Sequence, residues 1–207
     1  MNARHQAILT AREKLALNPL YLDTETTGRD QDSEIIEICI IDDSGQAVFQ
    51  SFIRPSRPIP QAVTRVHGIT DEMVKDAAIW MVVWPQVHDV LAGRHIGIYN
   101  ADFDLKMIRQ TLSNYRMRWP TLESFSSFCI MKLYAQYKGE WNSMRRDYRW
   151  HSLEDAGRQC HIPLPNTHRA KDDSLLARAL LHYMASDSLV NRLASLQGSG
   201  LNRVRHR

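Results

Sequence analysis

The sequence predicts an α/β fold in which a mixed five-stranded sheet is flanked by helices. Strand-like segments in the first third of the chain follow one another through short turns, which is typical of an antiparallel meander. Later strand-like segments alternate with helical ones, which is typical of parallel pairing. The chain has 207 residues, of which 43% are hydrophobic, and this is enough for one well-buried core. We therefore expect a three-stranded antiparallel meander that is extended by parallel strands.

The meander is predicted from three apolar segments. Residues 20–22 form a short apolar run, and residues 34–41 are rich in β-branched side chains. Residues 42–45 have the composition of a hairpin turn, and residues 47–53 supply the third strand. These three strands are expected to lie side by side.

Helical periodicity marks the segments on either side of the meander. Apolar residues recur at helical spacing over residues 3–17, which predicts a short amphipathic helix. In chain order we then expect a helical stretch after Pro60, a strand at 94–99, a helix at 102–113, a strand at 127–130 with a helix after it, and two helices over 151–186 separated by Pro163 and Pro165. The expected regions are an amphipathic helix at 1–18, one domain at 19–186 and a short basic tail at 187–207.

Composition narrows the class of protein. No apolar run approaches the roughly 20 residues that span a bilayer, and charged residues interrupt the N-terminus where a secretory signal would be apolar. We expect a cytoplasmic protein without a membrane partner. Cys39, Cys129 and Cys160 lack metal-ligand spacing, and we expect Cys39 and Cys129 to be buried, reduced thiols. A net charge of +3 permits binding to nucleic acid without indicating it.

Asp23 and Glu25 are the first candidate site residues. They stand two residues apart at the end of an apolar strand, so both side chains point to the same face. Two negative charges there are costly unless a cation neutralises them, and Mg²⁺ with oxygen ligands would do so. A solvated turn with incidental acids is the alternative interpretation.

Two further motifs place polar residues at element ends. Residues 99–104 join a strand to a helix, where Asp102 is suited to capping and Asp104 to supplying a third carboxylate. Residues 168–173 lead into a helix with apolar periodicity, so His168 and Asp173 can reach a site at its start. Asp172 lies about 100° away around the helix, and only one of the two acids should face the site.

Together these motifs resemble those of the DEDDh-type 3′–5′ exonucleases, a family that includes the proofreading epsilon subunit of bacterial DNA polymerase III. The family motifs are an Asp-x-Glu strand, an Asn-x-x-Phe-Asp helix start and a His-x-Ala-x-x-Asp helix, and all three occur here in order. Residues 66–70 also resemble the region that binds the polymer end. The resemblance covers about residues 19–186 and implies a ribonuclease H-like exonuclease domain. Tyr99 departs from it, because many relatives have histidine there.

The resemblance implies hydrolysis assisted by two divalent ions, Mg²⁺ or Mn²⁺. The implied metal ligands are Asp23, Glu25, Asp104 and Asp173, with His168 as the general base. The implied substrate contacts are Thr24, Thr26, His67, Asn100 and Phe103. His67 has an alternative role in structuring the turn at Gly68.

The expected substrate is the 3′ end of DNA, preferably single-stranded. RNA is the first alternative, and a binding module that has lost its chemistry is the second. About 20 residues follow the last predicted helix, so we expect a free-standing enzyme of DNA repair or end trimming rather than a polymerase subunit. Monomer and homodimer both remain open.

Residues 141–151 mix aromatic and cationic side chains. This composition suits base stacking with phosphate contacts, and equally a charged segment whose tryptophans pack inward.

Overall fold

The sheet of the molecule contains five strands in the spatial order β3-β2-β1-β4-β5. The computed structural model describes residues 2–117 and 124–188. The strands are β1 (Leu20–Thr26), β2 (Ile35–Ile41), β3 (Ala47–Phe52), β4 (His95–Ile98) and β5 (Ser126–Cys129). β2 is antiparallel to both β1 and β3, whereas β4 is parallel to both β1 and β5. The predicted fold class is confirmed.

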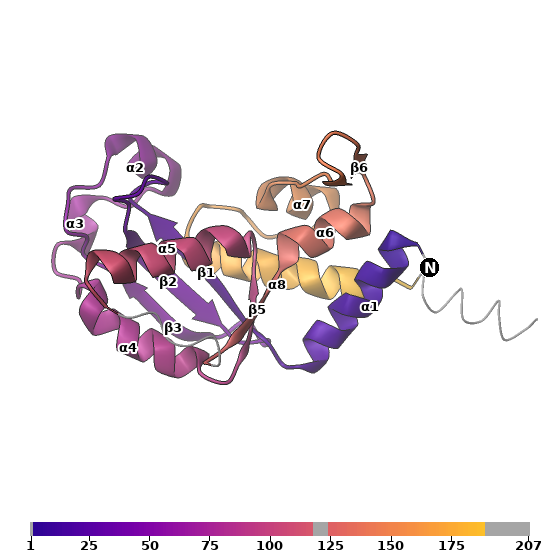
Figure 1. Cartoon of the computed structure of the whole chain (residues 1–207), viewed down its shortest axis with the longest axis horizontal. Helices are drawn as coiled ribbons and strands as arrows, with labels where there is room; N and C mark the ends of the chain where they lie inside the picture. Colours follow the sequence, from indigo (N-terminus) through magenta and orange to yellow (C-terminus); the bar gives the residue numbers. More distant parts are fainter. Residues whose placement is uncertain (1, 118–123, 189–207) are drawn as a thin grey trace, which may run out of the picture.

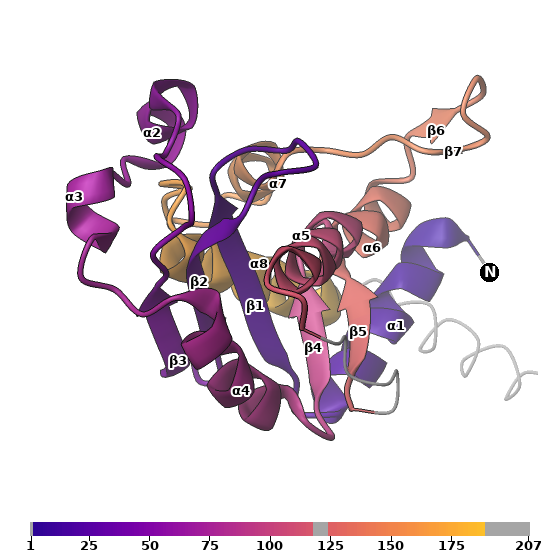
Figure 2. The ribbon, with the colours of Figure 1, turned by 60° about the vertical axis from the view of Figure 1, so that its left-hand side comes forward.

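Helices cover both faces of this sheet (Figure 1). They are α1 (Ala3–Ala16), α2 (Gln61–His67), α3 (Asp71–Val74), α4 (Trp80–Leu91), α5 (Ala101–Asn114), α6 (Ile130–Lys138), α7 (Leu153–Gln159) and α8 (Ala170–Ser186). Figure 2 shows α4 and α5 over one face of the sheet, with α8 on the other side of it. Each layer encloses its own buried apolar cluster, one with α4 and α5 and one with α1, α6, α7 and α8.

The two-residue period of β1 decides which helix layer each side chain meets. Leu20 and Leu22 belong to the apolar cluster of α4 and α5, whereas Tyr21 belongs to the cluster of α8. The alternation continues past the apolar part of the strand. Asp23 and Glu25 therefore lie on the α8 face.

The predicted N-terminal helix is present as α1, and it packs against α6 and α8. Ala7, Ile8 and Ala11 form its buried stripe. The Arg4 guanidinium donates hydrogen bonds to the Tyr137 hydroxyl at 2.8 Å and to the Asp187 carboxylate at 2.7 Å, which joins α1 to the ends of α6 and α8.

Two features of the sequence interpretation need correction. A small hairpin of β6 (Trp141–Asn142) and β7 (Asp147–Tyr148) was not predicted, because two-residue strands are too short to show a period. Cys129 is only partly buried, although Cys39 is fully enclosed as expected.

Two further expectations concern the ends of the chain and the membrane. The predicted basic tail lies outside the described residues from position 189 onward. Within the described part of the chain, none of the helices combines the length and the apolar character that crossing a bilayer requires.

Candidate active site

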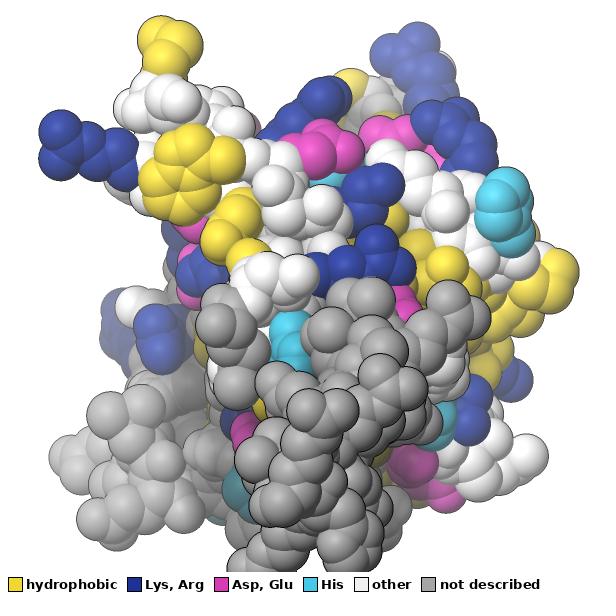
Figure 3. Space-filling view, turned by 90° about the vertical axis from the view of Figure 1, so that its right-hand side faces the viewer, with side chains coloured by type: hydrophobic (Ala, Val, Ile, Leu, Met, Phe, Trp, Pro, Cys, Tyr) yellow, Lys and Arg dark blue, Asp and Glu magenta, His cyan; other side chains and the backbone are white. Residues whose placement is uncertain are grey.

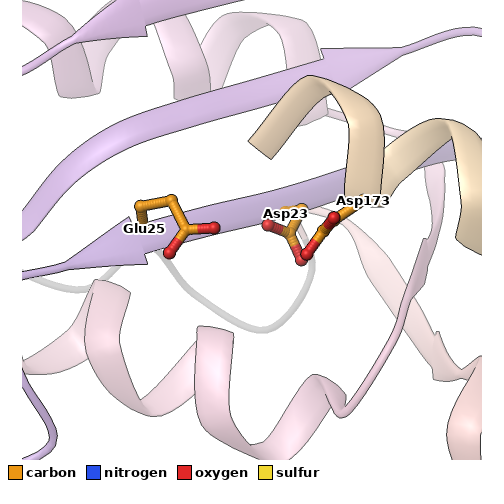
Figure 4. Close-up of side chains that lie close together, drawn as sticks. All are labelled: Asp23, Glu25 and Asp173. Atoms are coloured by element: carbon orange, nitrogen blue, oxygen red, sulfur yellow. The ribbon is translucent and has the colours of Figure 1, made fainter. Parts of the chain in front are cut away.

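Three carboxylates meet at the carboxyl end of β1. Asp23 and Glu25 come from β1, and Asp173 comes from the first turn of α8 (Figure 4). One oxygen from each side chain can be chosen so that all three lie within 4.8 Å of one another. They meet because the strand period turns both β1 acids toward the face that α8 covers.

Asp173, rather than Asp172, is the acid of α8 that faces this group. Asp173 is only 7% exposed. Asp172 lies outside the carboxylate group, where it accepts a hydrogen bond from the Thr167 hydroxyl at 2.5 Å. Asn166 and the backbone of residues 167–168 act to lower the pKa of Asp173, against the larger effect of burial. Its Oδ1 atom is nevertheless buried and has no hydrogen-bond partner among the described residues.

Asp104 approaches the site from the opposite helix layer. It lies in the first turn of α5, is 3% exposed, and accepts a hydrogen bond from the Thr24 hydroxyl at 2.7 Å. Thr24 points toward α5 because it alternates with Asp23 and Glu25 along β1. Asp104 is therefore held beside the three-carboxylate group rather than within it.

Burial makes the charged forms of these acids unfavourable. It raises the pKa of Glu25 to about 9 and the pKa values of Asp104 and Asp173 to about 7, and repulsion from neighbouring carboxylates adds to the effect. Burial also raises the pKa of Asp23 well above its usual range, with Asp104 as the most influential neighbouring charge. A divalent cation with oxygen ligands would neutralise these acids and provide a partner for the orphaned Asp173 oxygen. The residues present thus fit a divalent metal site.

A cavity of about 300 Å³ opens beside the carboxylates. Eight of the ten predicted site residues line it, namely Asp23, Thr24, Glu25, Asn100, Phe103, Asp104, His168 and Asp173. His168 is exposed and has a left-handed backbone φ of 53°, just before α8 begins. Asn100 is also left-handed, with a φ of 64°, where β4 turns into α5.

The other two predicted residues, Thr26 and His67, do not line the cavity. The Thr26 hydroxyl donates to the Gly28 carbonyl at 2.7 Å, within the turn after β1. His67 is buried, and its Nδ1 accepts a hydrogen bond from the Ile69 N–H at 3.0 Å. Burial lowers the pKa of His67, while the nearby Thr26 backbone opposes that shift. These contacts fit the turn-structuring role for His67.

Glu37 and Arg169 form an ion pair beside the site that sequence reasoning missed. Glu37 is 1% exposed and lies opposite Glu25 in the β1–β2 register. The Arg169 guanidinium donates to both of its carboxylate oxygens, at 3.0 and 2.8 Å, and the Ala170 N–H donates at 3.1 Å. The pair therefore anchors the backbone between His168 and Asp173. A single charge within an otherwise apolar strand was the available signal.

The far wall of the cavity comes from the start of α7. His151 and Ser152 line it, and their carbonyls accept hydrogen bonds from the Tyr99 hydroxyl at 2.9 and 3.2 Å. Arg29, in the loop after β1, adds an exposed cation to the rim. The sequence analysis included His151 in the candidate segment 141–151 but did not assign Ser152 or Arg29 to the site, because these residues come from separate segments.

Comparison with known sequences places the chain in a family. The exonuclease family model RNase_T matches residues 20–181. An exonuclease of Escherichia phage 186, named uncharacterized exonuclease CP81, is 36% identical over 179 residues, which cover 84% of this chain and 92% of the relative. DNA polymerase III subunit epsilon of Rickettsia conorii is 26% identical over 204 residues, covering 93% of this chain and 86% of the relative.

Solved structures share the fold. The nuclease domain of 3′hExo, a DEDDh family member bound to rAMP, superimposes with a TM-score of 0.67 at 17% identity, covering 84% of this chain and 94% of that one. Exonuclease X in complex with 5′-overhanging duplex DNA gives a TM-score of 0.58 at 23% identity, covering 86% of this chain and 99% of that one. With its carboxylates, its ribonuclease H-like sheet and these relatives, the chain belongs to the DEDDh-type 3′–5′ exonuclease family.

Proposed function

We propose that this exonuclease hydrolyses the terminal phosphodiester bond at the 3′ ends of DNA and releases nucleoside monophosphates. Two divalent cations, Mg²⁺ or Mn²⁺, would assist the reaction. The observation that carries the proposal is the meeting of Asp23, Glu25 and Asp173 around a buried, unpartnered carboxylate oxygen. The names of the epsilon relatives favour DNA as the polymer. The proposed role is free-standing, in DNA repair or end trimming.

The carboxylates provide the ligands. Asp23, Glu25 and Asp173 would hold one cation, and Asp104 would join Asp23 at a second. Bound divalent cations would supply a more acidic water and charge neutralisation at the scissile phosphate. Asn166 and the backbone of residues 167–168 favour the charged form of Asp173, which is the form that would bind a cation.

His168 is the proposed general base. Histidine side chains titrate near neutral pH, which suits them to accept a proton from water. The water oxygen bonds to phosphorus while the bond from phosphorus to the 3′ oxygen of the preceding nucleotide breaks. The water proton passes to His168, and the released 3′ oxygen takes a proton from solvent. The products are a nucleoside 5′-monophosphate and a strand shortened by one nucleotide.

The size of the cavity suits cleavage at an end. Its volume of about 300 Å³ is that of the smallest ligand pockets and matches a single terminal nucleotide. Asn100 and Phe103 line the cavity and would contact the sugar and base, and the backbone at Thr24 would receive the 3′-hydroxyl. Thr26 and His67 would act indirectly, by holding the end of β1.

RNA is the second candidate polymer. The observation in its favour is the bound rAMP of 3′hExo, whose fold this chain shares. The metal chemistry would be the same, and only contacts to the 2′-hydroxyl would separate the two substrates.

The test is digestion of 5′-labelled single-stranded DNA with Mg²⁺ or Mn²⁺, beside an RNA of the same sequence. We expect a ladder that shortens from the 3′ end, faster on DNA, and that disappears with EDTA. Asp23→Ala should lower the rate about a thousandfold or more, because metal contacts contribute several kcal/mol. Asp102→Ala is the matched control, since Asp102 is exposed and pairs with Lys132 at 2.6 Å. Internal cleavage, or no cleavage of either polymer, would contradict the proposal.

A further inference from the structure

The segment of residues 140–150, here called the arm, projects from the body of the molecule beyond α6 and α7 (Figures 1 and 2). Its hairpin pairs Trp141 with Tyr148, and the Arg149 N–H donates to the Glu140 carbonyl at 2.7 Å to close its base. The rings of Trp141 and Tyr148 meet edge to face at 5.3 Å. The arm is thus a structured projection.

The base of the arm continues directly into the cavity wall. His151 follows the arm and lines the cavity, where the Tyr99 hydroxyl holds its carbonyl. The buried His151 ring packs edge-on against Tyr134 at 5.6 Å and lies 3.6 Å from the Glu140 carboxylate. The arm and the cavity are therefore direct neighbours, joined at His151.

The arm exposes apolar and cationic side chains together. Trp141 is 57% exposed and Met144 98% exposed, so the tryptophan does not pack inward. Arg145 and Arg146 are exposed at the tip, and neither guanidinium makes a hydrogen bond or an ion pair with the described residues. Trp150, at the base of the arm, is 45% exposed. Figure 3 views this end of the molecule and shows hydrophobic and cationic side chains side by side in its upper part.

This combination matches the chemistry of an unpaired strand. Aromatic rings stack on bases, and arginines contact phosphates without regard to sequence. Paired bases offer only their edges in the grooves, so the flat faces of the tryptophans suit single-stranded rather than duplex nucleic acid.

We propose that the arm binds the single-stranded part of the substrate immediately upstream of its 3′ end. The inference rests on the proposed function, because it takes the cavity as the place where the 3′ end is held. Trp141 and Trp150 stack on bases, and Arg145 and Arg146 contact phosphates.

The experiment compares a substrate that extends beyond the cavity with one that occupies the cavity alone. A single-stranded DNA of about 20 nucleotides extends past the cavity, since stacking sites of this kind span about 4–16 nucleotides. The p-nitrophenyl ester of thymidine 5′-monophosphate fills the cavity alone. For the variant with both Trp141→Ala and Trp150→Ala, we expect KM on the DNA to rise about 10–100-fold, while ester hydrolysis stays within about twofold.

The arginines are tested by salt dependence. In the variant with both Arg145→Gln and Arg146→Gln, the negative slope of log affinity against log salt should become shallower by about 1.4, which corresponds to the loss of two single-strand phosphate contacts. Arg57→Gln with Lys75→Gln is the matched control, because both cations are exposed and lie toward the α2–α3 end of the molecule. That control should keep the original slope.

Each outcome decides the inference. Equal losses on DNA and ester, or unchanged DNA kinetics, would overturn it. Equal weakening on blunt duplex and single-stranded DNA would overturn the single-strand assignment. If the unmodified protein cleaves neither substrate, the proposed function fails instead. DNA binding measured by fluorescence anisotropy in EDTA then still tests the arm, and unchanged binding by the arm variants would overturn it.

Discussion

Glu37 is a buried carboxylate in β2, and its hydrogen bonds explain why a charge is tolerated there. A buried carboxylate is costly unless it is paired and hydrogen-bonded, and Arg169 with the Ala170 N–H supplies three hydrogen bonds. Like charges directly opposite one another in a sheet are also unfavourable, and Glu37 faces Glu25. The Arg169 charge acts against the rise in the pKa of Glu25 and so offsets part of this repulsion. We therefore infer that Glu37 positions the start of α8.

Glu37→Gln tests this positioning role. The amide cannot accept two charged hydrogen bonds, so we expect kcat on single-stranded DNA to fall about 10–100-fold with little change in KM. The control is Glu34→Gln, because Glu34 is also buried but accepts its hydrogen bonds from Ser56 and Tyr115, away from the cavity. Thermal unfolding should show comparable losses of stability in both variants. A similar fall in kcat for both would show that Glu37 is merely structural.

At the scale of elements, β4 and β1 bring the proposed catalytic groups together at the carboxyl ends of these two strands. β4 delivers Asn100 and Asp104 to the cavity through the turn into α5. It packs closely on its parallel neighbour at Gly97, where a side chain would lie 2.9 Å from Phe128 Cζ and 3.1 Å from Ile130 Cδ1. A methyl group at this position would force the Phe128 and Ile130 side chains to shift.

Gly97→Ala is expected to lower the free energy of unfolding by about 1–3 kcal/mol, because extra atoms in a packed core force neighbours to shift. For a chain of this size the Tm should fall by about 2–12 °C, measured by thermal unfolding. Ser127→Ala, on the exposed part of β5, should leave Tm nearly unchanged. A Tm for Gly97→Ala equal to that of the unmodified protein would mean that β4 tolerates the methyl group.

At the scale of the whole molecule, the acids of the site oppose folding when no cation is bound. The net charge of the chain is +3, yet the cavity concentrates four buried or half-buried carboxylates. Their pKa values in the folded state lie above the ordinary values near 4 that the unfolded chain has. The folded state therefore binds more protons than the unfolded state, and stability falls as pH rises from about 4 through the folded pKa values.

We expect the Tm of the metal-free protein in EDTA to fall between about pH 5 and pH 8.5, because this range lies between the ordinary carboxyl pKa near 4 and the raised pKa values, near 7 for Asp104 and Asp173 and about 9 for Glu25. Mg²⁺ should restore most of the loss at the upper pH, since binding to the folded state alone stabilises it. Thermal unfolding across pH measures both effects. Asp104→Asn with Asp173→Asn should flatten the pH dependence. A Tm in EDTA that stays constant or rises over this range would contradict the prediction.

The sequence by itself determined the elements and the first half of the site. Strand and helix periods are local properties, so the meander, the flanking helices and α1 were predictable from residue patterns. The placement of Asp23 and Glu25 on one face follows from the same two-residue period. Short elements such as β6 and β7 were missed because they contain less than one readable period.

The family resemblance implied that Asp104 and Asp173 join the acids of β1, but only the tertiary structure decided how these distant residues are held together. Asp104 lies on the α5 side, where it accepts a hydrogen bond from the Thr24 hydroxyl. Asp173 joins Asp23 and Glu25 from the α8 side. The tertiary structure also paired Glu37 with Arg169, which stands 132 residues later in the chain. It exposed the tryptophans of the arm, where composition allowed either orientation. Such contacts depend on how the helix layers pack across the sheet, and no local pattern of side chains encodes that packing.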